Sequence, residues 1–117
     1  MVAEDINGTK GFNNPVSLRD IEAAAHLIHK VGRVTPLIQS MFLSRNVTNG
    51  EVYLKLENMQ LTGSFKFRGA FNKINHLTDA QKARGVITAS AGNHAQGVAL
   101  TSHLLGIKAI VVMPHGA

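Results

Sequence analysis

The order of apolar segments in the second half of the chain is the feature that most restricts its fold. Short apolar runs occupy residues 86–89 and 109–113, and a helical stretch over 93–105 separates them. The second run is continuously apolar and ends at Pro114, which is typical of a strand buried on both faces. A strand, a helix and a strand in this order predict a parallel pair joined by a right-handed crossover.

The segments before this unit extend the same pattern. Residues 51–57 alternate, with Val52, Leu54 and Leu56 on one face, which predicts a further strand of the same sheet. Two helices follow it. The first has apolar residues at helical spacing, at Phe67, Ala70, Phe71, Ile74 and Leu77. The second is opened by Thr78, with Gln81 three residues later, and is closed by Gly85.

The N-terminal part is less regular. A capped helix is expected from Ser17 to near Gly32, and residues 37–46 are ambiguous, with a short helix as one interpretation. Residues 1–16 are expected to be a mobile lead-in before a unit over 17–117. The predicted class is α/β, a three-layer fold with a parallel sheet and flanking helices.

Composition excludes several classes of protein. With 117 residues, of which 44% are hydrophobic and 16% charged, the chain is long and apolar enough for one small domain and not for general disorder. Its net charge of +5 is spread along the sequence, which argues against a nucleic-acid partner. The absence of cysteine excludes disulfides and cysteine zinc sites. No apolar run suggests a membrane partner or a signal peptide, so we expect a cytoplasmic protein.

Lys66 lies where a purely structural role would not place a lysine. Ser64 is expected to cap the helix that follows, so Lys66 falls in the first turn. The positive end of the helix dipole and the neighbouring Arg68 both disfavour an ammonium there. The sequence therefore favours a neutral amine that acts as nucleophile or base.

A second motif follows the strand expected at 86–89 and reads Ser90-Ala91-Gly92-Asn93-His94-Ala95-Gln96-Gly97. Its small residues allow close approach of the backbone to a ligand, and the free N–H groups at a helix start favour an anion. Taken alone, the motif is better explained as a tight turn with Asn93 as N-cap. Glu57, at a strand end, is interpreted as a solvated side chain rather than a base.

No metal site is expected. The six histidines are scattered, and His94 lacks the spacing of a metal ligand. His26 and His29 lie three residues apart on one helix but have no acidic partner, so a solvated face explains them better.

Residues 55–70 and 90–97 together resemble the threonine dehydratases (threonine ammonia-lyases), which are tryptophan-synthase-like, fold type II pyridoxal-phosphate enzymes. The resemblance runs from about Val16 to Gly116. It implies that Lys66 holds pyridoxal 5'-phosphate as a Schiff base and removes the α-proton of the substrate. It also implies cofactor-binding roles for Phe65, beside the ring, and for Asn93, at the phenolic oxygen. The substrate carboxylate would be bound by Ser90, Ala91, Gly92, Asn93 and His94.

The implied reaction is β-elimination from L-threonine, or more slowly from L-serine, to a 2-oxo acid and ammonia. The residues after Lys66, Phe67-Arg68-Gly69-Ala70, favour the dehydratases over cysteine-synthase-like relatives. A serine dehydratase is an alternative within the resemblance. Serine racemases are similar too, but they place a serine as second acid/base where this chain has Ala91. The full-length family member is expected to be a homo-oligomer.

Family members extend far beyond residue 117 and carry a glycine-rich loop for the cofactor phosphate, which this sequence lacks. The resemblance therefore covers the N-terminal portion only, and the 117 residues alone are expected to be inactive or poorly folded, because the exposed sheet edge needs missing strands. Two other interpretations stay open. One is a truncated, non-catalytic remnant of the fold, and the other is an anion-binding α/β domain whose lysine never forms an imine.

Overall fold

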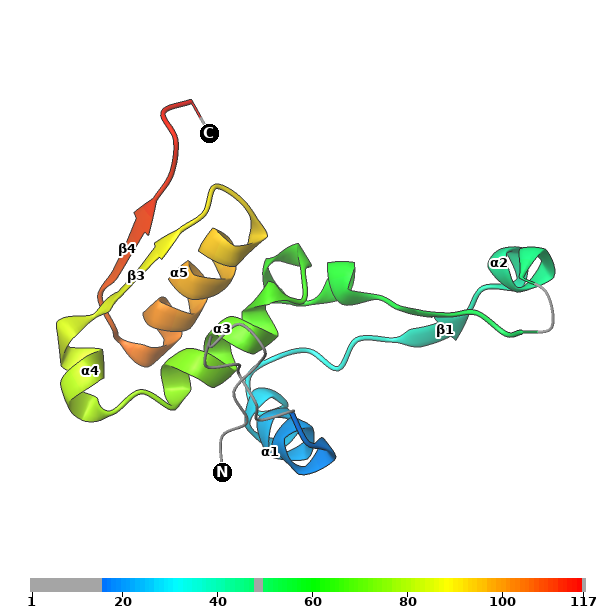
Figure 1. Cartoon of the computed structure of the whole chain (residues 1–117), viewed down its shortest axis with the longest axis horizontal. Coiled ribbons are helices and arrows are strands. Elements are labelled where there is room, and N and C mark those ends of the chain that lie inside the picture. Colours follow the sequence, from blue (N-terminus) through cyan, green and yellow to red (C-terminus); the bar gives the residue numbers. More distant parts are fainter. Residues whose placement is uncertain (1–15, 48–49, 117) are drawn as a thin grey trace, which may run out of the picture.

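The structure, a computed structural model, describes residues 16–47 and 50–116. Apart from Val16, the predicted lead-in lies outside these residues. The described chain contains both helices and strands (Figure 1). In order they are α1 (Leu18–Ile28), β1 (Leu37–Gln39), α2 (Met41–Asn46), β2 (Tyr53–Lys55), the 3₁₀ turns η1 (Glu57–Met59) and η2 (Leu61–Gly63), α3 (Lys66–Asn75), α4 (Asp79–Arg84), β3 (Val86–Ala89), α5 (Asn93–Leu105) and β4 (Ala109–Val112).

The predicted helix starts at Ser17 and Thr78 are confirmed. Each hydroxyl accepts a hydrogen bond from the backbone three residues later, and the side chain there accepts one back from the cap residue, so both helices begin with a capping box. Helix α1 ends at Ile28, earlier than predicted, and a hydrogen-bonded turn continues to Gly32. The end of α5 is confirmed, since Gly106 adopts the left-handed conformation with φ of 65°.

The parallel strand pair is also confirmed. Strands β3 and β4 are parallel, Val86 pairs with Ala109 and Ala89 with Val112, and α5 is the crossover. The prediction for 51–57 is wrong in one respect, because β2 pairs antiparallel with β1 and does not join β3 and β4. The ambiguous segment 37–46 contains both β1 and α2. Since α2 reverses the direction of the chain, the two flanking strands run antiparallel.

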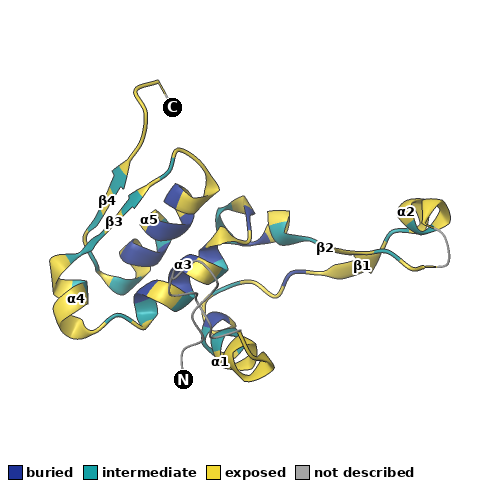
Figure 2. Ribbon diagram, in the orientation of Figure 1, coloured by how far each residue is buried: buried dark blue, intermediate teal, exposed yellow. Residues whose placement is uncertain are grey.

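Helix α3 lies between α1 and α5, and α5 lies on the β3–β4 pair (Figures 1 and 2). Two apolar clusters hold these layers together. The first joins α1 to α3 through Ile28, Phe67 and Phe71, and the second joins α3 to α5 through Ala70, Ile74 and Val98. The buried stripe predicted for α3 is therefore the centre of the described fold.

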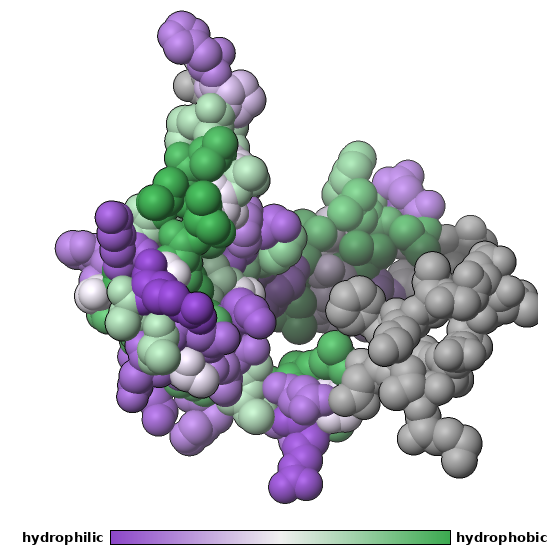
Figure 3. Space-filling view, turned by 60° about the vertical axis from the view of Figure 1, so that its left-hand side comes forward, coloured by the Kyte–Doolittle hydropathy of each residue, from purple (hydrophilic) through white to green (hydrophobic). Residues whose placement is uncertain are grey.

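Only one face of the β3–β4 pair is covered by described residues. Alternate residues are half-buried against α5, whereas Ile87, Ile110 and Val112 point away and are 70%, 49% and 52% exposed. Apolar side chains run along this strip in Figure 3. The expectation that 109–113 is buried on both faces is thus wrong for the described residues, because nothing among them packs on the second face.

Strands β1 and β2, with α2 at their tip, extend away from the α3–α5 body (Figure 1). Their apolar side chains are largely exposed, including Leu37 at 63% and Phe42 at 76%. The Cα radius of gyration is 18.1 Å, against about 13 Å for a compact domain of about 100 residues. In the part of the chain that the structure describes, no helix is long and apolar enough to cross a membrane.

Candidate active site

Lys66 is the first residue of α3, which confirms its predicted place in the first helical turn. The helix begins one residue later than expected, with Phe65 at the N-cap position and no side-chain cap. The prediction of Ser64 as N-cap is therefore displaced by one residue. Its hydroxyl still accepts a long hydrogen bond of 3.4 Å from the Lys66 N–H. Ser64 is extended while Phe65 is already helical, so the turn of the chain falls between them.

The Lys66 side chain is exposed, and its Nζ lies 5.0 Å from the centroid of the Phe65 ring. This is the geometry of a cation–π contact, which at an exposed site contributes about 0.5–1 kcal/mol. Phe65 itself is 58% exposed. An accessible amine and an accessible aromatic ring are therefore adjacent at the start of α3.

Gly97 in α5 brings the two sequence motifs together. A Cβ atom built on Gly97 would lie 3.1 Å from the carbonyl carbon and oxygen of Lys66 and from the backbone nitrogen of Phe67. A side chain at this position would press on the backbone of α3, so glycine lets the two helices approach this closely. Asn93 lies four residues earlier on the same face of α5, about 6 Å along the helix axis. The contact thus places Asn93 one helical turn from the backbone of Lys66.

Ser90 shapes the loop before α5. Its backbone N–H donates to the carbonyl of Val112 at 2.9 Å, which continues the parallel ladder past β3. Its Oγ accepts hydrogen bonds from the backbone N–H groups of Gly92 at 3.2 Å and Ala95 at 3.3 Å. The loop therefore lies at the carboxyl end of β3, where open parallel sheets bind ligands.

The interpretation of Asn93 as N-cap is wrong. Gly92, which has no side chain, occupies that position, Asn93 is the first helical residue, and the hydroxyl that accepts from the first turn, at the Ala95 N–H, belongs to Ser90. The first N–H groups of a helix have no partner within it, and Ser90 Oγ accepts only from that of Ala95, so this helix start is a place for an anion. Ala91, Gly92, Asn93 and His94 are all exposed there, while Ser90 is half-buried.

Glu57 is not a solvated carboxylate. Its Oε2 accepts from Arg68 Nε at 2.7 Å, its Oε1 from Arg68 Nη2 at 2.8 Å, and Thr35 Oγ1 donates to Oε1 at 2.5 Å. The hydrogen bonds from Arg68, and then that from Thr35, lower the pKa of Glu57 to about 2, although partial burial opposes the shift. Glu57 is therefore a structural ion-pair partner rather than a base.

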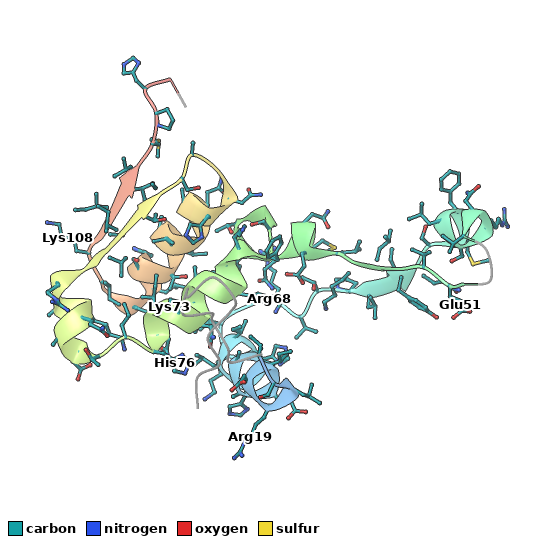
Figure 4. All side chains as sticks on the ribbon, in the orientation of Figure 1. Arg19, Glu51, Arg68, Lys73, His76 and Lys108 are labelled. Atoms are coloured by element: carbon teal, nitrogen blue, oxygen red, sulfur yellow. The ribbon has the colours of Figure 1, made fainter. Side chains whose placement is uncertain are left out.

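The same ion pair contradicts the prediction that the charge of Arg68 disfavours an ammonium at Lys66. Arg68 extends from α3 toward the segment that joins α1 to β1 (Figure 4), and its guanidinium is neutralised by Glu57. It does not act on Lys66 as an isolated cation. Lys66 does lie at the positive end of the α3 dipole, as the sequence predicted.

Gln60 is a supporting residue that the sequence did not reveal. It is 2% exposed, and its Oε1 accepts from the N–H groups of Arg33 at 2.9 Å and Leu61 at 2.8 Å. Its Nε2 donates to the carbonyl of Arg33 at 2.8 Å. Gln60 thereby fixes the two 3₁₀ turns that lead into Lys66. A single polar residue in an irregular segment carries no periodic signal, so only the fold could identify it.

Comparisons with known proteins show the family of this chain. A family model described as "Pyridoxal-phosphate dependent enzyme" matches residues 28–117. The catabolic L-threonine dehydratase of Staphylococcus aureus strain N315 is 71% identical over 102 residues, which cover 87% of this chain and 30% of that protein. The chain thus spans about a third of the length of the curated relatives that it matches.

Solved structures give the same picture. The threonine deaminase from T.th. is similar with a TM-score of 0.74 and 42% identity, over 87% of this chain and 32% of that one. The serine racemase of Dictyostelium discoideum is similar with a TM-score of 0.78 and 39% identity, over 87% and 33%. The model match, the relatives and the fold together show that the chain belongs to the family of pyridoxal-phosphate dependent enzymes.

Proposed function

We propose that this chain supplies part of the active site of a threonine dehydratase, an ammonia-lyase that converts L-threonine, and more slowly L-serine, to a 2-oxo acid and ammonia. The observation that carries the proposal is the contact of Gly97 with the Lys66 backbone, which joins an accessible lysine to the exposed start of α5. The relatives named threonine dehydratase and threonine deaminase support this choice of reaction. The activity would belong to a longer protein that contains these residues.

The described residues fit pyridoxal 5'-phosphate. The exposed Lys66 amine is available for a covalent link to its aldehyde, and Phe65 offers an apolar surface beside that amine. The Asn93 side-chain amide, one turn from the Gly97 contact, is the donor proposed for the ring oxygen of the cofactor. When bound, the cofactor supplies an electron sink for the bond that is broken at the substrate α-carbon.

Each proposed site residue would then have a defined role in the reaction. Lys66 holds the cofactor and takes the proton from the substrate α-carbon. The loop from Ser90 to His94 binds and orients the substrate carboxylate through the free N–H groups at the start of α5. Ser90 keeps that loop in shape through its two backbone hydrogen bonds. In the net reaction the hydroxyl leaves Cβ and the nitrogen leaves as ammonia, while one water is lost and one is gained.

Serine racemisation is the alternative reaction, since serine racemases are among the solved structures similar to this chain, as threonine deaminases are. It requires a second group that moves a proton on the other face of the substrate. The methyl group of Ala91 has no such proton, so we propose dehydration as the main reaction. Chiral chromatography of L-serine reactions tests this choice. Formation of D-serine as fast as ammonia would show that the racemase interpretation is correct.

Reductive trapping tests the proposed lysine. The longest form of the protein that carries these residues is incubated with pyridoxal 5'-phosphate, reduced with borohydride and digested, and the labelled peptide is identified by mass spectrometry. We expect the label on Lys66, loss of label in Lys66→Ala, and full label in Lys73→Ala, a matched lysine on the same helix. Equal labelling of Lys66→Ala and the wild-type protein would refute the assignment, and favour the remnant or anion-binding interpretations.

The proposal extends to the location, the oligomeric state and the metabolic role of the full-length protein. We propose a cytoplasmic homo-oligomer as the full-length form. The relative from Staphylococcus aureus is named catabolic, which favours threonine catabolism over isoleucine biosynthesis.

A further inference from the structure

A cavity of about 480 Å³ lies beside the candidate active site, between α3, α4, β3 and the first turns of α5. This volume is within the range of small-molecule sites in proteins, which is about 300–1,000 Å³. Much of its wall is apolar and includes Ala70, Ile74, Val86 and Val98. Of the proposed site residues only His94 lines it, whereas Lys66 and Asn93 do not.

The polar part of the wall is cationic. Lys73 and Arg84 line the cavity together with His94 and the neutral Gln81, and no described aspartate or glutamate does. Within residues 16–47 and 50–116, the one ion pair joins Glu57 to Arg68, so neither Lys73 nor Arg84 is neutralised by a described carboxylate. An apolar wall with uncompensated cations favours a ligand that carries an apolar body and a negative charge.

We propose that this cavity binds a short aliphatic carboxylate, with its hydrocarbon chain against the α3 and α5 side chains and its charged end at Lys73 and Arg84. A carboxylate suits these partners because both side chains donate hydrogen bonds and neither accepts one. The proposal does not depend on the proposed dehydratase function, because Lys66 is outside the cavity; His94 is the one residue shared with the proposed carboxylate loop, and variants at Lys73 and Arg84 separate the two sites.

Gly69 offers a way to close the cavity without disturbing the fold. It lines the cavity from α3, and a Cβ atom built on it meets no atom within 4 Å. The side chain of a Gly69→Met variant would therefore occupy the space proposed for the ligand. Because Gly69 is within a helix, the substitution also removes the helical penalty of glycine and should not weaken folding.

The experiment is a titration of the ¹⁵N-labelled protein, in the longest form that carries these residues, with hexanoate at neutral pH, followed by amide NMR spectra. We expect saturable shifts that centre on Gly69, Gln81, Gly85 and Val98, and no comparable shifts with 1-hexanol, which has the same apolar body and no charge. The double variant Lys73→Gln/Arg84→Gln should bind about tenfold more weakly, as expected for two exposed charge contacts. Gly69→Met should not bind measurably.

The matched control is Arg19→Gln, which removes one cation from α1, away from the cavity (Figure 4), and should bind hexanoate as the wild-type chain does. Four results would overturn the proposal. They are hexanoate affinity unchanged in the double variant, unchanged in Gly69→Met, equal shifts with hexanol, or an absence of shifts at these amides. Spectra without dispersed amide signals would also overturn it, since the cavity exists only between packed α3, α5 and β3.

Discussion

Gly97→Ala tests the contact on which the candidate site depends. The added methyl group would lie 3.1 Å from three backbone atoms of Lys66 and Phe67, whereas carbon atoms in comfortable contact are about 3.5–4.0 Å apart. Backbone atoms cannot rotate away as the end of a flexible side chain can. Helix α5 must therefore move away from the start of α3 by several tenths of an ångström.

Overpacking of this kind costs about 1–3 kcal/mol of the free energy of unfolding. Alanine also has a helix propensity about 1 kcal/mol better than that of glycine, which offsets part of the cost. Gly69→Ala separates the two effects, because Gly69 is also within a helix but has open space where its Cβ would be. The propensity gain cancels between the two variants, so Gly97→Ala should be less stable than Gly69→Ala by about 1–3 kcal/mol.

Urea unfolding followed by far-UV circular dichroism measures this difference. Equal slopes with different midpoints would show that stability itself has changed. Gly97→Ala should also reduce borohydride trapping of pyridoxal phosphate at Lys66, because Asn93 moves together with α5. If the two variants agree in stability to within about 0.5 kcal/mol, the close approach of α5 to Lys66 is refuted.

Three further predictions concern residues around the site. Because the pKa of Glu57 is depressed from 4.5 to about 2 in the folded protein, its ion pair should stabilise the fold above pH 4.5 and lose that contribution as the pH falls toward 2. After allowance for partial exposure, the ion pair should contribute about 1–2 kcal/mol to the free energy of unfolding. Urea unfolding between pH 4.5 and 2 should show that this loss is absent in Glu57→Gln and present in Glu22→Gln. Gln60→Leu should cost about 2–4 kcal/mol in the same assay, because the N–H groups of Arg33 and Leu61 lose this partner and the Arg33 carbonyl keeps only a long hydrogen bond from Arg68, and a neutral result would contradict the role of this amide. Ser90→Ala should cost about 1 kcal/mol, as loss of a cap does, and should weaken binding of the substrate carboxylate, seen as a raised KM with little change in kcat.

Local patterns explain why so many helix boundaries were predictable. The capping boxes at Ser17 and Thr78, and the glycine stop after α5, involve residues within four positions of each other. The stripe of α3 follows from helical periodicity alone. Such features act over one or two turns, so the sequence contains all the information that they need.

Strand pairing could not be predicted from local patterns in this way. Residues 51–57 alternate as a strand should, but alternation does not reveal the partner, and β2 pairs with β1 rather than with β3. The apolar run in β4 likewise indicated burial on both faces, whereas Ile110 and Val112 are about half exposed in the described chain. What covers a sheet face depends on segments far away in the sequence.

The sequence by itself determined which residues we propose for the chemistry. Lys66 and the loop from Ser90 to Gly97 are identifiable from residue type, order and family resemblance, because those features are written along the chain. Only the tertiary structure decided how they meet. The approach of Gly97 to the Lys66 backbone, the ion pair of Arg68 with Glu57 and the buried amide of Gln60 all join residues more than ten positions apart. Their distances depend on how the helices and turns pack, and no local pattern specifies that packing.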